Sequence, residues 1–116
     1  MDIAVILTTT VYDFGHVHQS VDTYHLTVQS GRHNAVDLRY CLPPQYHEPV
    51  GAVMASLSDD GHTLTVCGPR GRQGVLVAGR HDIYRSGEIP LSYASCSIAV
   101  AQSEDADALV RQHTME

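Results

Sequence analysis

Short apolar or alternating segments, separated at close intervals by turn residues, run through the whole of this sequence. The segments that we expect to form strands are residues 3–10, 23–29, 35–41, 50–57, 63–67, 75–78, 89–93 and 97–101. Glycine, proline, serine and aspartate separate them, and Asp60-Gly61 is the strongest hairpin signal in the sequence. The pattern predicts an all-β fold of about eight short strands with little helix, in the form of a small jelly roll, a β-barrel or a sandwich.

The length of 116 residues suits a single β domain over residues 1–116, because a chain of this size can bury one core without disulfide bonds. The three cysteines are widely spaced and form no C-x-x-C pair, which favours buried free thiols. Residues 103–110 allow two interpretations. They can begin a helix that Ser103 caps, or form a polar turn that leads into a last strand.

No apolar run approaches the roughly eighteen residues of a membrane helix. The apolar segment at the start of the sequence is too short for a signal peptide, and no basic residues precede it. We therefore expect a cytoplasmic or other intracellular protein without a membrane partner. The net charge of −6 argues against nucleic acid as a partner.

All seven positive side chains are arginines, and Arg70, Arg72, Arg80 and Arg85 lie close together in the sequence. An arginine fork can hold phosphate or carboxylate with two hydrogen bonds, which lysine cannot do. The plainer interpretation is a set of solvated loop ends, and the sequence leaves both open.

The order of several short motifs resembles the trimeric dUTPase family, whose fold is a small β jelly roll. Residues 34–38 read N-A-V-D-L, where the family has A-G-x-D-L, and residues 69–72 read P-R-G-R, where it has P-R-S-G. Residues 79–89 read G-R-H-D-I-Y-R-S-G-E-I, which resembles G-x-I-D-x-x-Y-R-G-E-I. Residues 104–110, E-D-A-D-A-L-V, stand in the place of G-D-R-I-A-Q-L-V. The resemblance covers roughly residues 34–110.

This resemblance implies a homotrimer that binds a deoxyuridine nucleotide together with Mg²⁺. Asp82 would lie near the attacking water and Asp37 would order the shell of metal and water, so these two are the expected catalytic residues. Water activation by a carboxylate, and neutralisation of charge on the phosphates, are what hydrolysis between two phosphates requires.

The resemblance also implies the ligand-binding residues. Arg70 would meet phosphate, Tyr84 would pack under the deoxyribose, and Gly71 and Arg85 would complete the ligand-binding motifs. Gly71 stands where the family has a serine hydroxyl, and the segment from Arg70 to Asp82 is shorter than in the family. These departures predict a nucleotide-binding domain with impaired catalysis. Some viruses carry domains of this kind re-used as protein-binding modules, so we expect a viral or phage-like module.

His16 and His18 form an H-x-H motif that supports a second hypothesis. Residues i and i+2 of a strand share a face, so both rings could bind one metal ion, with Asp22 or His25 completing the ligands. The spacing resembles the first metal motif of the cupins. The plainer interpretation is two exposed histidines that precede a strand.

A third hypothesis needs no small-molecule site. A small β domain can recognise a protein partner through an exposed sheet edge or an apolar patch, and no linear motif marks such a surface in advance. The three hypotheses therefore remain open on the sequence alone.

Overall fold

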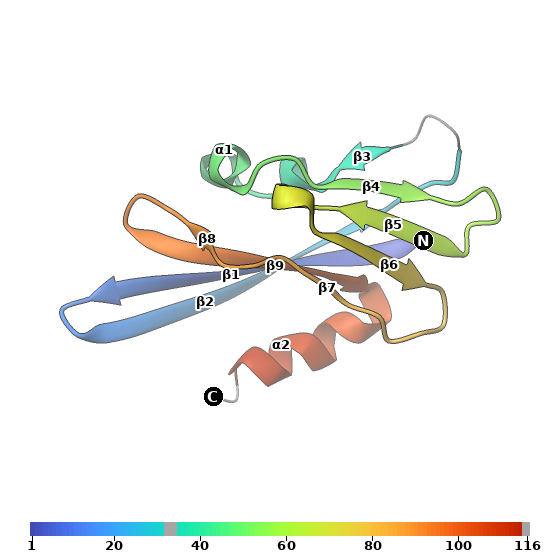
Figure 1. Ribbon diagram of the computed structural model, residues 1–116. Coiled ribbons are helices and arrows are strands. Elements are labelled where there is room, and N and C mark those ends of the chain that lie inside the picture. The colour runs from blue at the N-terminus through green and yellow to red at the C-terminus, as the bar shows by residue number, and fades with distance from the viewer. Residues whose placement is uncertain (32–34, 115–116) are drawn as a thin grey trace.

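The computed structural model describes residues 1–31 and 35–114, and it contains two antiparallel sheets and several short helical segments (Figure 1). The first sheet, sheet A, has the order β2 (His16–Thr27), β1 (Asp2–Asp13), β9 (Ala94–Gln102), β7 (Tyr84–Arg85), and β8 (Ile89–Pro90) also pairs with β9. The second sheet, sheet B, has the order β3 (Val36–Asp37), β4 (Met54–Leu57), β5 (Thr63–Cys67), β6 (Gln73–Val77). The mostly β fold expected from the sequence is confirmed, and the described strands form two open sheets rather than a closed barrel.

Short helical segments join the strands. They are the 3₁₀ turns η1 (Leu38–Cys41), η2 (Pro44–Tyr46), η3 (Pro69–Gly71) and η4 (Ser103–Asp105), and the helices α1 (His47–Val50) and α2 (Ala106–Thr114). Residues 103–110 are therefore helical and the alternative of a last strand is wrong, but Ser103 is the first residue of η4 and does not cap it, because the N-cap position is Gln102. The helical start agrees with the acidic side chains of this first turn, since negative charge is favoured at a helix N-terminus.

The main core lies between the two sheets. Sheet A contributes alternate residues of β1 and β9, and sheet B contributes the inward residues of β4, β5 and β6. The buried members from these strands are Ile3, Val5, Leu7, Cys96, Ile98, Val100, Ala55, Leu57, Leu64, Val66 and Leu76. Burial of this apolar surface is the main stabilising contribution to such a fold.

A second apolar cluster lies on the other face of sheet A, beneath α2. Leu109 of α2 packs there with Ile6 of β1 and with Ala99 and Ala101 of β9, and Val21 of β2 packs against their margin. Because β1 is covered on both faces, its first half reads as an unbroken apolar run rather than an alternating one.

The β1–β2 hairpin, called the arm below, is the longest feature of the fold. Each strand has 12 residues, and the register runs without interruption from Asp2 opposite Thr27 to Asp13 opposite His16. Its tip projects at the left of Figure 1, away from sheet B, and the molecule measures 50 × 29 × 21 Å. The arm therefore gives the domain its elongated shape.

Some of the expected strands agree with the structure and others differ from it. Segment 63–67 is β5 as predicted, and Asp60-Gly61 lies in the connection between β4 and β5. Segment 35–41 forms strand only at residues 36–37, because the Asp37 side chain accepts the Arg39 N–H and starts η1. In contrast, β2 begins seven residues before the expected residue 23, and β7 was not predicted as a strand.

The cysteines are free. Cys96 is buried and Cys41 is half-buried, and burial raises the pKa of both thiols. Cys67 at the end of β5 is exposed, so the expectation of a buried thiol is wrong for this residue. Within residues 1–31 and 35–114, no helix has both the length and the apolar character needed to cross a membrane.

Candidate functional site

The Asp37 carboxylate is held by hydrogen bonds and an ion pair to nearby residues. Its Oδ1 accepts the backbone N–H of Arg39 and the backbone N–H of Val53, each at 3.2 Å. Its Oδ2 lies 3.0 Å from Nε of Arg39 in a largely buried ion pair. These contacts tie β3 to the start of β4, which is a structural role for the carboxylate. Asn34, the first residue of the same motif, lies outside the described residues.

Arg70 and Gly71 form the turn between β5 and β6. Arg70 has φ of 61° and Gly71 has φ of 76°, so two consecutive residues adopt the left-handed region that favours glycine. The turn borders a cleft of about 280 Å³. The residues that line this cleft are Pro49, Val50, Pro69, Arg70, Arg72, Ser86, Gly87, Glu88 and Ile89.

The other expected ligand-binding residues do not line this cleft. Arg85 is exposed on β7, and its backbone carbonyl accepts a 2.9 Å hydrogen bond from the Arg72 guanidinium. Tyr84 is 3% exposed and belongs to the core between the sheets, so its ring is surrounded by protein. Burial raises the pKa of the Tyr84 hydroxyl.

Asp82 lies in the loop between β6 and β7, next to His81. Nδ1 of His81 is 2.6 Å from Oδ1 of Asp105 in η4, and this hydrogen bond is the main reason why the pKa of His81 is raised. The loop is thereby fastened to the start of the C-terminal helical region. Asp82 is half-buried there and adds to the negative potential at His81.

The strand register separates the two expected catalytic aspartates along sheet B. Asp37 pairs with Met54, Met54 with Cys67, and Cys67 with Gln73, so Asp37 and the Arg70 turn lie at one end of the sheet. β6 runs from there to Val77 at the other end, and Asp82 follows in the next loop. The sheet thus brings Arg70 toward the end that holds Asp37 and directs Asp82 toward the opposite end.

Comparison with known proteins adds no family. No family model, no curated protein and no solved structure matches the chain. The resemblance to dUTPases therefore stays a prediction, as do the deoxyuridine nucleotide, the Mg²⁺ and the homotrimer that it implies.

His16 and His18 lie on one face of β2, as the H-x-H spacing predicts, with ring centroids 6.5 Å apart. Asp22 is on the same face farther along the strand, whereas His25 has the opposite parity, and its ring approaches Ser103 at 3.4 Å. Among the described residues, no group of three side chains of the metal-binding types comes together. Metal binding at the two histidines stays a prediction.

The arm presents two features that the sequence patterns do not predict. At the tip, Tyr12 is 65% exposed, Phe14 98% and Val17 59%. Phe14 has φ of 46° in the two-residue turn with Gly15, a left-handed conformation that a bulky residue rarely adopts. The signal that could have revealed this hairpin is Phe14-Gly15 between two runs rich in β-branched residues.

The outer edge of β2 is the second such feature, because β2 is the last strand of sheet A. Met1 N donates to Val28 O at 2.8 Å and Val28 N donates to Met1 O at 3.0 Å, so even-numbered residues on this side of the hairpin bond to β1. By the alternation of antiparallel pairs, the odd-numbered residues point their backbone N–H and C=O groups outward. These residues are Val17, Gln19, Val21, Thr23, His25 and Thr27.

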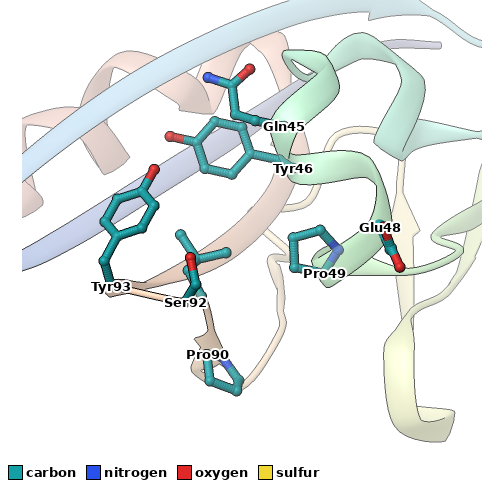
Figure 2. Close-up of a pocket in the computed structure, with 8 residues that line it drawn as sticks. Gln45, Tyr46, Glu48, Pro49, Pro90, Ser92 and Tyr93 are labelled. Carbon is teal, nitrogen blue, oxygen red and sulfur yellow. The ribbon is translucent and has the colours of Figure 1, made fainter.

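A cleft of about 470 Å³ lies between the η2–α1 segment and the β8–β9 loop, beside the outer half of the arm (Figure 2). Tyr46, at the end of η2, and Tyr93, in the β8–β9 loop, lie on its two sides, and Pro49 and Pro90 extend the lining. The Tyr46 hydroxyl is 3.4 Å from the Thr9 hydroxyl of β1, which connects this cleft to the arm. Among the described residues that line this cleft, Glu48 is the only charged one.

Proposed function

We propose that this domain is a protein-interaction module and that its arm accepts a strand of a partner at the outer edge of β2. This is the third hypothesis of the sequence analysis, with the edge now assigned to β2. The observation that carries it is an outer strand of 12 residues whose outward backbone groups have no strand to pair with among the described residues. Such an edge is a ready template for another strand.

The composition of β2 supports this role. Natural sheets commonly protect an outer strand with lysine, proline, a bulge or several charges. β2 contains no lysine and no proline, its register with β1 is continuous, and Asp22 is its only acidic residue. The outer edge of β2 therefore lacks the usual features that prevent strand addition.

The tip supports the same function. Tyr12, Phe14 and Val17 are large apolar side chains that face solvent together at one end of the molecule. Aromatic residues of this kind are enriched at protein interfaces, and a turn held in an uncommon backbone conformation is a frequent sign of a functional segment. A partner that covers the tip would remove this apolar surface from water.

Strand addition can be tested with a displayed library of random dodecapeptides. We expect enriched peptides with alternating β-branched residues, because the backbone provides affinity and alternate side chains provide specificity. Gln19→Pro removes one outward N–H and leaves the β1–β2 hydrogen bonds intact, so it should weaken peptide binding at least about tenfold. Gln19→Ala removes the same side chain but keeps the N–H, and it should bind like the unmodified protein.

Two results would contradict this proposal. One is a library that yields no peptide above background. The other is a set of peptides that bind Gln19→Pro as tightly as Gln19→Ala, because these peptides would then use another surface.

Nucleotide binding of the dUTPase type is the second candidate function. Arg70 and Arg72 both line the cleft of about 280 Å³, and paired guanidinium groups favour a phosphate ligand. Catalysis would additionally require Asp82 to reach the same ligand. A titration with deoxyuridine nucleotides that follows the melting temperature tests this candidate.

A further inference from the structure

We infer that the strand added at the outer edge of β2 comes from a second copy of this chain, with Gln19 of the two copies opposite each other on a twofold axis. This inference rests on the proposed function and names the partner of the same edge. It predicts a homodimer in which two arms lie side by side and sheet A continues from one copy into the other.

Symmetry limits the registers that are possible. A twofold axis perpendicular to the sheet makes the two β2 strands antiparallel and keeps each face of sheet A on the same side of the dimer. Residues that face each other across the axis must therefore have the same parity. The outward-pointing odd residues then pair with odd residues, so their free N–H and C=O groups meet as hydrogen-bonded pairs.

Charge narrows these registers to those with Gln19 or Ser20 on the axis, because Ser20 on the axis would also place a histidine, His18, opposite Asp22. With Gln19 on the axis, His16 of each copy lies opposite Asp22 of the other, which pairs a histidine with a carboxylate on both sides of the axis. A register with Asp22 on the axis would instead place two carboxylates directly opposite each other, which is unfavourable.

Apolar contacts favour Gln19 on the axis, because Ser20 on the axis would place Val17 opposite Thr23. Val17, which is 59% exposed, lies opposite Val21 of the second copy, and Val21 already packs at the margin of the apolar cluster beneath α2. Val17 thus gains an apolar contact that the single copy does not offer it.

Sedimentation equilibrium tests whether the second copy binds. A strand pair is at the small end of specific interfaces, so we expect a dimer with Kd on the order of 1–100 μM. Gln19→Ala should form the dimer with a similar Kd. Gln19→Pro should raise the dimer Kd at least about tenfold, because the axial pair loses its two N–H donors. Circular dichroism of Gln19→Pro confirms that the variant is folded.

Cysteine cross-linking tests the register without a proline. In a Cys67→Ser background, which removes the exposed native thiol, Gln19→Cys should form a disulfide-linked dimer under mild oxidation. Hydrogen-bonded pairs have Cα atoms about 5.5 Å apart, within the reach of a disulfide. Ser20→Cys and Val21→Cys are matched controls that should stay uncross-linked, since their symmetry mates lie two and four residues out of register.

The outcomes separate this inference from the proposed function. A cross-linked dimer of Ser20→Cys or Val21→Cys instead of Gln19→Cys would overturn the register. The protein could remain a monomer at all concentrations and still bind library peptides in a manner sensitive to Gln19→Pro. This result would show that the partner strand does not come from a second copy, and it would leave the proposed function standing. A monomer that binds no peptide would overturn both.

Discussion

The hydroxyl oxygen of Tyr84 occupies the space that a Cβ atom at Gly68 would need. Tyr84 belongs to β7 of sheet A, and Gly68 follows β5 of sheet B, so this contact joins the two sheets. The backbone of Gly68 has φ of −95°, which any residue can adopt. Glycine is therefore required at this position for space, not for conformation.

Gly68→Ala should consequently destabilise the domain. The added methyl group would have to displace the Tyr84 ring, which is also confined by Gly74, where a Cβ would lie 2.9 Å from Cδ2 of Tyr84. Overpacking of this kind costs about 3 kcal/mol of unfolding free energy. Denaturant unfolding measures the effect. Gly87→Ala is the matched control and should change stability by less than about 0.5 kcal/mol, because no atom lies within 4 Å of its Cβ position.

Phe14→Asn should stabilise the free domain while it weakens association. Asn-Gly is the preferred sequence for a two-residue hairpin turn with positive φ, whereas Phe14 holds φ of 46° at a cost. We expect a gain of about 1 kcal/mol in unfolding free energy. The same variant removes the exposed ring, so partner affinity should fall. A loss of stability in this variant would show that the Phe14 ring contributes contacts to the fold.

The His81–Asp105 pair predicts a pH dependence of stability. The hydrogen bond to Asp105 raises the pKa of His81 above its usual value of 6.5, and the nearby charges of Glu104 and Asp82 act in the same direction. The folded-state pKa is the higher one, so this stabilisation is fully present below the unfolded-state pKa and is lost as the pH rises through the folded-state pKa. Melting temperatures of the unmodified protein and His81→Gln should differ near about pH 5.5 and converge above about pH 8.5. A difference in melting temperature that stays constant across this pH range would contradict a stabilising role of the His81–Asp105 hydrogen bond.

The nucleotide candidate predicts that dUMP, and a non-hydrolysable dUTP analogue with Mg²⁺, raise the melting temperature. A ligand that binds only the folded state stabilises it by about 2.7 kcal/mol at a concentration of one hundred times Kd. The ribose and thymidine analogues should have no effect, and Arg70→Ala should remove the response because it removes a guanidinium from the cleft. Asp82→Asn then tests whether any hydrolysis depends on this carboxylate. A flat response to every nucleotide would reject this candidate.

Much of the sheet architecture could be predicted from local patterns. β5 and its hairpin with β4 follow from an alternating run and Asp60-Gly61, whose conformational demands are local. The strand expected over 35–41 failed because one side chain, Asp37, accepts a backbone N–H two residues ahead and turns the chain. For β2, the polar first half concealed a strand that is stabilised by its pairing with β1 rather than by burial.

The candidate site was harder to predict. Tyr84 lies in a run that resembles a nucleotide-binding motif, but its place in the core follows from the two glycines that leave room for its ring, and these belong to other segments. Whether Asp37, Arg70 and Asp82 share one end of a sheet depends on the direction of β6, which no local pattern encodes.

The sequence by itself determined that the chain forms β structure, where most turns lie, and that His16 and His18 share a face, because these properties depend on residues within a few positions of each other. The tertiary structure decided that β2 is an outer strand, that the tip of the arm is left exposed and that Tyr84 is buried. These properties arise from contacts between residues far apart in the chain, and only packing of the two sheets and α2 determines which surfaces remain free to bind.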